Sequence, residues 1–238
     1  MANIVLVGGA WIGAWAWRAV TPELRAAGHQ VYPLTLTGFG DRAHLGTPET
    51  DLSDHVQDVI AAIEAEELTD VVLVGHSYAG SVVTVVADRI PERLAKVIYV
   101  AGVTPEHGKR LFDLIPGVEE IMQAMADAEG DGWRIPFISD ETLDLYYGEH
   151  GLTGQHLGWL RTHAHGVPIA THREVIKLAT PDSSPVPRVF VHCTGDGPAH
   201  ELPHYGRDWV RAEIATGHWP MATKPVELAA LLDRLVVA

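Results

Sequence analysis

The sequence is poor in basic residues and contains no long hydrophobic run. Its 238 residues include 17 Lys and Arg against 31 Asp and Glu, a formal net charge of −14. An acidic surface repels phosphate groups, so nucleic acid and anionic membranes are not expected partners. The longest apolar runs, such as residues 81–87, are too short to cross a bilayer.

Cysteine is nearly absent. The single cysteine, Cys193, cannot form an internal disulfide, which fits a reducing compartment. Residues 1–7 contain neither a basic leader nor a cleavage site and run directly into a β-branched segment. We therefore expect no signal peptide and a cytoplasmic protein.

Strand and helix patterns alternate along most of the chain. Hydrophobic residues make up 47% and charged residues 20%, a balance typical of globular proteins. Short apolar runs predict strands at 4–7, 29–36, 71–74, 96–100, 188–192 and 211–214, and helices are predicted at 14–27, around 56–63, at 78–89 and at 226–237. The alternation predicts an α/β fold with a parallel sheet covered on both faces.

The alternation breaks between residues 104 and 185. This stretch holds short helical segments, many glycines and several aromatic residues, and strand patterns resume after it. We expect a helical cap at 104–185 inserted into a core formed by 1–103 and 186–238, rather than an independent domain.

The segment 71–80, Val-Val-Leu-Val-Gly-His-Ser-Tyr-Ala-Gly, has the pattern of a nucleophile elbow. A strand leads into Gly-x-Ser-x-Ala and then directly into a helix, which is the context this motif requires. Small residues at Gly75 and Ala79 let strand and helix approach closely, so that the Ser77 hydroxyl projects above the sheet. We predict that Ser77 is a nucleophile; the alternative is a plain turn residue.

A serine hydroxyl needs a general base within hydrogen-bonding reach. Among the 14 histidines, His218 follows the last predicted strand and precedes the last helix, where this architecture carries its base. The orienting acid falls between nucleophile and base in the chain. Asp196 lies in a Gly-rich turn after the 188–192 strand, whereas the competitors Asp182 and Asp208 do not directly follow a strand. A simple turn-forming role for Asp196 stays open.

The turn after the first strand is predicted to complete an oxyanion hole. The sequence Gly8-Gly9-Ala10-Trp11 follows residues 4–7, so the N–H groups of Ala10 and Tyr78 form the expected donor pair. The candidate substrate-pocket residues are Gly9, Trp11, Trp133, Trp159 and Trp219. For the aromatic residues among them, a place in the hydrophobic core is the alternative.

These motifs together resemble the α/β-hydrolase superfamily. The segments at 7–17 (Val-Gly-Gly-Ala-Trp-Ile-Gly-Ala-Trp-Ala-Trp), 75–80 and 216–218 are similar to those of bacterial relatives of the plant methylesterase and hydroxynitrile lyase branch. The resemblance covers essentially the whole chain. It implies a mainly parallel sheet of about six strands, a helical cap, no cofactor, and a Ser77–Asp196–His218 triad with Ala10 and Tyr78 as oxyanion donors. It also implies a homodimer.

Departures from the branch guide the choice of reaction. Gly8 stands where the branch usually has histidine, and Ala79 stands where the elbow usually ends in glycine. The lyases have a lysine after the catalytic histidine, where this chain has Trp219. We therefore expect hydrolysis of a small carboxylic ester or lactone through an acyl-enzyme.

Other functions remain as alternatives. The same triad could carry out a non-hydrolytic reaction, such as a lyase step or a rearrangement of a small natural product, or the fold could serve binding alone. A nicotinamide-binding Rossmann enzyme is a more distant alternative. Against it, Ala10 replaces the central glycine of the dinucleotide motif, and no acid follows the second strand. No metal motif is present: His-Glu-x-x-His is lacking.

Overall fold

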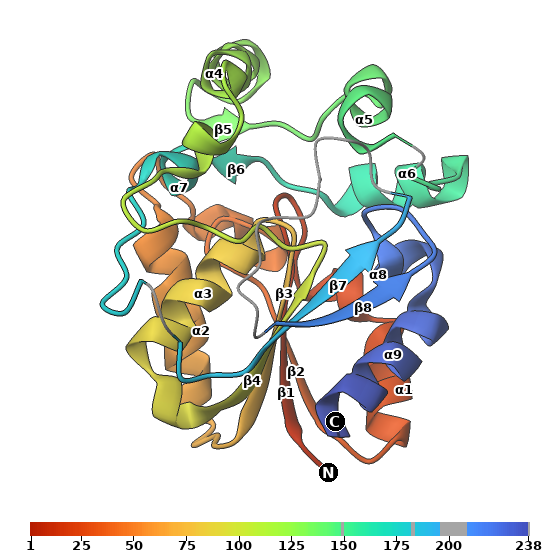
Figure 1. Ribbon diagram of the computed structural model, residues 1–238. Coiled ribbons are helices and arrows are strands. Elements are labelled where there is room, and N and C mark those ends of the chain that lie inside the picture. Colours follow the sequence, from red (N-terminus) through yellow and green to blue (C-terminus); the bar gives the residue numbers. More distant parts are fainter. Residues whose placement is uncertain (149, 182–183, 196–208, 238) are drawn as a thin grey trace.

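The computed structural model describes residues 1–148, 150–181, 184–195 and 209–237. In this part of the chain, six parallel strands form one sheet in the order β2-β1-β3-β4-β7-β8 (Figure 1). Their bounds are β1 Asn3–Val7, β2 Gln30–Leu34, β3 Val71–His76, β4 Leu94–Val100, β7 Arg188–Cys193 and β8 Val210–Ile214. The parallel sheet predicted from the alternating pattern is confirmed.

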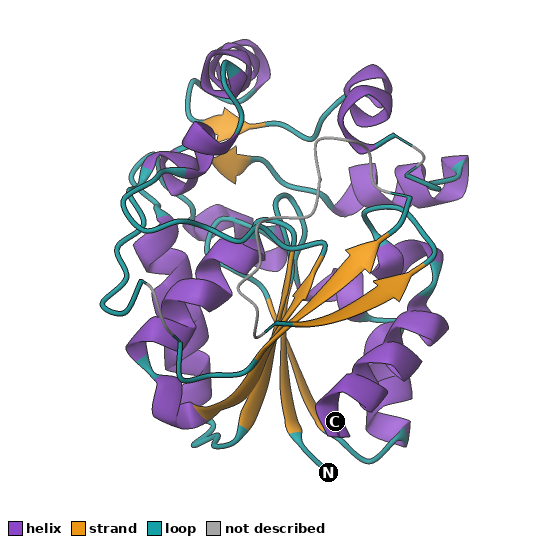
Figure 2. Ribbon diagram, in the orientation of Figure 1, coloured by secondary structure: helices purple, strands orange, loops and turns teal. Residues whose placement is uncertain are grey.

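Helices cover both faces of the sheet (Figure 2). On one side lie α2 Leu52–Ala65 and α3 Ala79–Arg89, and on the other lie α1 Val20–Ala26 and α9 Pro225–Val237. The predicted helix over 14–27 is divided: η1 Ala14–Trp17 is a 3-10 turn and α1 begins only at Val20. The short helical elements η2 Gly40–Leu45, η3 Pro91–Arg93 and α8 Pro220–Thr223 lie in connections.

The boundaries and faces of α2 follow from its sequence. Asp51 caps the helix, because its side chain accepts from the Asp54 N–H while the Asp54 side chain accepts from the Asp51 N–H. The apolar positions spaced by three and four residues face the sheet and are buried, as the pattern predicted: Val56, Val59, Ile60 and Ile63.

The elements between β4 and β7 form a layer above the carboxyl ends of the strands (Figure 1). They are η4 Leu111–Leu114, α4 Val118–Glu129, β5 Arg134–Ile135, α5 Asp140–Tyr147, α6 Gly154–His163, β6 Val167–Pro168 and α7 Ala170–Arg173. The pair β5–β6 is an antiparallel two-stranded ribbon that the sequence pattern did not predict, because each strand has only two residues. We call this whole layer the cap.

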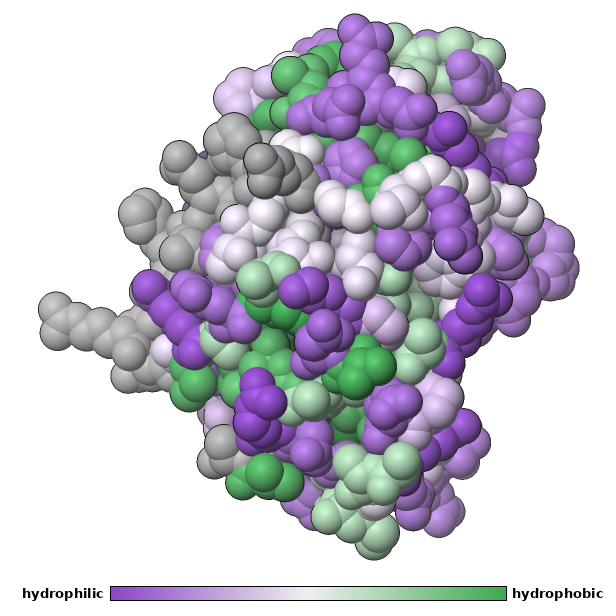
Figure 3. Space-filling view, turned by 90° about the vertical axis from the view of Figure 1, so that its right-hand side faces the viewer, coloured by the Kyte–Doolittle hydropathy of each residue, from purple (hydrophilic) through white to green (hydrophobic). Residues whose placement is uncertain are grey.

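The surface of the molecule combines hydrophilic and hydrophobic areas. On the face seen in Figure 3, hydrophilic residues surround smaller hydrophobic areas. In the described part of the chain, no helix is long and apolar enough to cross a membrane.

Glycine at the start of α3 is required by packing. A Cβ at Gly80 would lie 2.2 Å from the Val103 carbonyl oxygen, whereas a Cβ at Gly158 in α6 would meet nothing within 4 Å. Gly80→Ala is therefore expected to lower the free energy of unfolding by about 1–3 kcal/mol. Gly158→Ala, the matched control, should raise it by up to about 1 kcal/mol through helix propensity. Urea unfolding of both variants measures this; equal stabilities would contradict the packing argument.

Candidate active site

Ser77 lies at the sharp turn between β3 and α3 with a backbone φ of 51°, a conformation that L residues rarely adopt. Surrounding hydrogen bonds hold this turn in place. The Ser77 N–H donates to Val100 O (3.2 Å), and the Ser77 carbonyl accepts from the N–H groups of Gly80 and Val103 (both 2.9 Å). The strained backbone thus persists because three hydrogen bonds fix it.

The structure brings the two predicted reacting side chains together. His218 Nε2 lies 2.8 Å from Ser77 Oγ, although the residues are 141 positions apart. His218 follows β8, whose carboxyl end lies on the same side of the sheet as that of β3. With the imidazole neutral, the Ser77 O–H donates to Nε2, which is the arrangement that activates a serine hydroxyl.

His76, the residue before Ser77, holds the loop that carries His218. Its Nε2 lies 2.7 Å from the His218 carbonyl oxygen, and because a carbonyl only accepts, His76 Nε2–H is the donor. The two imidazole rings lie 4.9 Å apart. One residue of the elbow motif therefore anchors the backbone of the general-base candidate.

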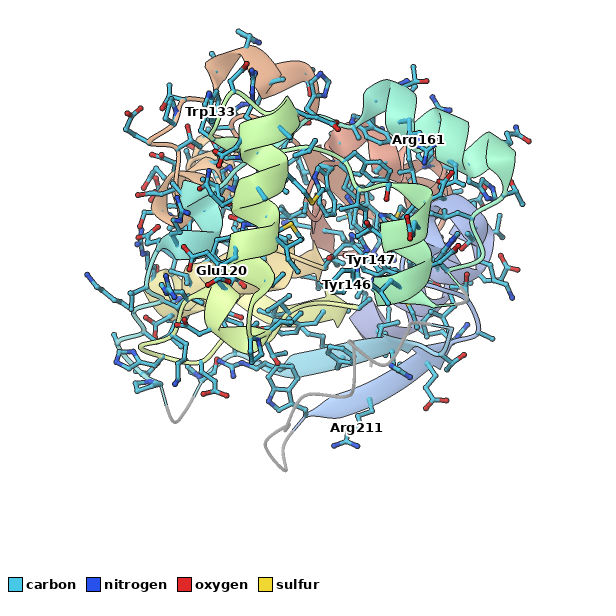
Figure 4. The ribbon with its side chains drawn as sticks, turned by 90° about the horizontal axis from the view of Figure 1, so that it is seen from above. Glu120, Trp133, Tyr146, Tyr147, Arg161 and Arg211 are labelled. Atoms are coloured by element: carbon cyan, nitrogen blue, oxygen red, sulfur yellow. The ribbon has the colours of Figure 1, made fainter. Side chains whose placement is uncertain are left out.

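The His218 ring is enclosed by aromatic residues. Only 1% of His218 is exposed, and the rings of Tyr147 and Trp219 lie 4.5 and 4.9 Å from it. Tyr147 belongs to α5 of the cap, which lies over the sheet in the view from above (Figure 4). Burial lowers the pKa of His218 to about 3, so the imidazole is neutral and can accept a proton over the physiological range.

The predicted oxyanion loop lies directly against the nucleophile. A Cβ at Gly9 would lie 2.7 Å from Ser77 Cβ and 2.9 Å from the His76 carbonyl oxygen, so only glycine fits this position. Ala10 follows in the same turn. Tyr78 stands at the N-terminus of α3, where backbone N–H groups have no acceptor within the helix. Ala10 and Tyr78 thus lie in segments on either side of Ser77.

The sequence matches the alpha/beta hydrolase family over residues 4–231. The chain belongs to this family. Its six-stranded parallel sheet agrees with the fold that the resemblance implied. The strand order also differs from that of a dinucleotide-binding Rossmann fold, whose first three strands run in the order 3-2-1.

Relatives of this chain include named esterases. A carbendazim hydrolyzing esterase from Nocardioides sp. is 52% identical over 116 residues, which cover 49% of this chain and 48% of that protein. The match therefore spans about half the length of that relative. Methyl jasmonate esterase 1 from Vitis vinifera is 27% identical over 98% of this chain and 96% of its own. These are similarities to proteins with esterase names.

The fold is shared with solved structures. An extracellular alpha/beta-hydrolase from a Paenibacillus species superposes with a TM-score of 0.86 at 22% identity, covering 98% of both chains. A methylesterase from Arabidopsis superposes with a TM-score of 0.75 at 21% identity, covering 100% of this chain and 99% of the other. At these identities the likeness establishes the fold.

The predicted third residue, Asp196, lies outside the described residues, as do its competitors Asp182 and Asp208. The chain leading to Asp196 is described. After β7, the Gly195 N–H donates to the carbonyl oxygen of Thr216 (2.9 Å), two residues before His218. The residue preceding Asp196 is thus hydrogen-bonded to the loop of the general-base candidate.

The predicted pocket residues occupy different places. Gly9 and Trp219 lie beside Ser77 and His218, respectively.

Trp159 packs edge-on against Trp15 at 4.8 Å, with the Arg18 guanidinium over its ring. Trp133 lies under the Arg134 guanidinium and away from Tyr147 in Figure 4. Trp11 is buried, and its indole N–H donates to the Ile135 carbonyl oxygen in the cap. Their contact with substrate stays a prediction.

Two residues of this site were not predicted. His76 was visible as the middle residue of the elbow, but its partner is a backbone carbonyl, which leaves no sequence signal. Tyr147 was visible only as one of several cap aromatics, and its place over His218 depends on how α5 packs. In the described part of the chain, no cluster of three or more His, Cys, Asp or Glu could hold a metal ion.

Buried neutral histidines predict that acid destabilises the fold. Burial lowers the pKa of His218 to about 3 and of His172 to about 4, and it also lowers the pKa of His55. Below pH 6.5 the unfolded chain binds protons that the folded chain does not. Stability should therefore fall as the pH drops from 6.5 to 5, with a slope that approaches about 1.4 kcal/mol per pH unit for each of His218 and His172.

Urea unfolding at pH 7.0, 6.0 and 5.0 measures this slope. His172→Phe keeps an aromatic ring against Tyr78 and removes one titrating group. The change of its free energy of unfolding with pH should therefore be smaller by up to about 1.4 kcal/mol per pH unit. An unchanged slope in this variant would contradict the assignment of His172.

Proposed function

We propose that this hydrolase cleaves small carboxylic esters or lactones through an acyl-enzyme on Ser77. The observation that carries the proposal is the 2.8 Å contact between Ser77 Oγ and the Nε2 atom of the buried, neutral His218. A serine at a strained elbow, hydrogen-bonded to an unprotonated imidazole, is the arrangement that acyl transfer requires.

In the first half-reaction, Ser77 Oγ attacks the ester carbonyl carbon while its proton moves to His218 Nε2. The carbonyl oxygen becomes an oxyanion and accepts hydrogen bonds from the N–H groups of Ala10 and Tyr78. The tetrahedral intermediate then collapses: the C–O bond to the leaving group breaks, and His218 returns the proton to the departing alkoxide.

In the second half-reaction, water attacks the acyl carbon. His218 Nε2 accepts a proton from this water and returns it to Ser77 Oγ as the acid leaves. Asp196 orients the imidazole through Nδ1 and stabilises the imidazolium that forms in each half. The hydrogen bond from Gly195 to Thr216 supports this role, because it brings the residue before Asp196 to the loop of His218.

The cap and the relatives suggest the substrate class. Tyr147 and Trp219 enclose His218, so the leaving group departs past aromatic surfaces rather than charged ones. Relatives are named as esterases for methyl jasmonate and for carbendazim. We therefore infer apolar or aromatic esters with small alcohol groups, and methyl carbamates such as carbendazim as a second class.

A non-hydrolytic reaction on the same triad is the alternative. One relative that is 32% identical over 44% of this chain is named a synthase, norfluorocurarine synthase 1 from Strychnos nux-vomica. The two reactions differ in whether an acyl group is transferred to Ser77, which mass spectrometry distinguishes.

We further propose a cytoplasmic homodimer without a cofactor. The compartment is inferred from the lone, buried Cys193, which precludes an internal disulfide, and the dimer is inferred from the family resemblance.

The first test is the intact mass after treatment with a fluorophosphonate. The wild type is expected to gain one adduct, whereas Ser77→Ala is expected to gain none, because only Ser77 is activated by His218. Ser81→Ala is a matched control four residues later, within α3: Ser81 is fully buried, and the variant should label like the wild type. An adduct on Ser77→Ala would remove Ser77 as the nucleophile.

The second test addresses the acid. Asp196→Asn is expected to lower kcat for a methyl ester about 10³–10⁴-fold, because the imidazole loses its orientation and its stabilised cation. Asp182→Asn is the control and should retain activity within about twofold. A large loss in Asp182→Asn with little loss in Asp196→Asn would show that the acid is Asp182.

A further inference from the structure

Trp11, the residue after the oxyanion donor Ala10, has an unusual backbone. Its φ is 66°, in the left-handed region that bulky side chains rarely occupy. Such a conformation costs on the order of 1–3 kcal/mol and persists only where neighbouring contacts enforce it. The contacts around Trp11 therefore indicate what determines the shape of the oxyanion loop.

Three contacts with the cap hold Trp11 in place. The indole N–H donates to the carbonyl oxygen of Ile135 in β5 at 3.1 Å. The Phe137 ring packs edge-on against the indole at 5.6 Å. The Trp11 carbonyl accepts from the His165 N–H at 3.1 Å, just before β6. Only 7% of Trp11 is exposed. The β5–β6 ribbon and the residues next to it thus hold both the side chain and the backbone carbonyl of Trp11.

Tyr78, the second oxyanion donor, is also held by its side chain. The phenol oxygen lies 2.9 Å from Nδ1 of His55 in α2, and His55 Nε2 lies 2.7 Å from the Thr37 carbonyl oxygen. Because the carbonyl only accepts, Nε2 carries the hydrogen and Nδ1 accepts from the Tyr78 O–H. Burial lowers the pKa of His55, which keeps this neutral tautomer in place.

The cap covers the other face of Tyr78. His172 in α7 stacks on the phenol ring at 5.1 Å with an interplanar angle of 14°. His172 Nδ1 lies 2.8 Å from Thr171 Oγ1, which donates to the carbonyl oxygen of Pro168 in β6 at 2.7 Å. The contacts of Trp11 and of Tyr78 therefore converge on the same two-stranded ribbon, in which Ile135 pairs with Val167.

We propose that Trp11 and Tyr78 are positioning residues through which the β5–β6 ribbon of the cap, together with His55 of α2, fixes the two oxyanion N–H groups. The core supplies the donors in two loops that are separate in sequence, and the ribbon determines their mutual spacing. The oxyanion hole is complete only with the ribbon seated against both side chains. This inference rests on the proposed acyl-transfer function and adds a role for the cap beyond shaping the pocket.

The test uses four single variants of the full chain. Trp11→Phe removes the N–H donor to Ile135, and Tyr78→Phe removes the O–H donor to His55. Their controls make the same atomic changes elsewhere. Trp15→Phe removes an indole N–H that has no hydrogen-bond partner among the described residues, and Tyr99→Phe removes a buried phenol O–H that bonds Thr84 Oγ1 at 2.8 Å.

Each positioning variant is expected to lower kcat for a methyl ester at least about tenfold with KM changed less than about twofold, because oxyanion contacts form mainly in the transition state. The controls should keep kcat within about twofold of wild type. A merely structural role would lower the melting temperature of Trp11→Phe and Tyr99→Phe alike without this split between kcat and KM. Equal kcat in variants and controls would overturn the proposal.

Hydrogen–deuterium exchange decides the proposal independently of activity. Peptides covering residues 8–13 should exchange faster in Trp11→Phe than in Trp15→Phe, and faster in Phe137→Leu, which loosens the same contact from the cap side. Unchanged exchange in both would overturn the proposal even if esters are cleaved. If the variants exchange faster while the wild type neither cleaves esters nor reacts with fluorophosphonate, the positioning role stands and the proposed function is disproved.

Discussion

The close approach of β3 and α3 at Ser77 is the constraint on which the site depends. The strand enters the turn fully buried, the backbone turns through a left-handed serine, and the helix begins at once. Gly75 permits this approach, since a Cβ there would lie 2.8 Å from the Ala79 carbonyl oxygen and from Val83 Cγ2 in α3. Gly80 lets α3 approach the backbone of Val103, which a Cβ would meet at 2.2 Å. The turn exposes the Ser77 hydroxyl beyond the sheet and directs the first N–H groups of α3 into the same space. The same turn therefore sets both the position of the Ser77 hydroxyl and that of the N–H groups at the start of α3.

The loops that carry His218 and Gly9, together with the cap, surround Ser77 and His218. His76 donates from the elbow to the backbone carbonyl of His218, so the turn that carries Ser77 also holds the loop of His218. Gly9 places the oxyanion loop against Ser77, and the cap residue Tyr147 encloses the His218 ring. Burial then keeps His218 unprotonated. The chemistry therefore depends on contacts between segments that are far apart in the sequence.

In the proposed mechanism the cap has two functions: it encloses His218, and it braces the loops that carry Ala10 and Tyr78. Its ribbon β5–β6 has only two residues in each strand, yet it provides the acceptor for Trp11 and the support for His172 over Tyr78. The strained backbone of Trp11 is consistent with this bracing, because an unsupported bulky residue would relax out of the left-handed region. A small element can thus fix a site when its hydrogen bonds are buried.

The sequence determined the parallel sheet and the elbow, and it singled out Ser77 and His218, whose side chains the structure brings within hydrogen-bonding distance. These follow from local rules: buried parallel strands are short β-branched runs, an elbow needs small residues around its serine, and the base follows the last strand. The break between η1 and α1, the ribbon β5–β6, and the places of Tyr147 and His76 were decided only by the tertiary structure. Their partners are backbone carbonyls and ring faces contributed by distant segments. Such partners leave no residue pattern, because any side chain presents the same backbone.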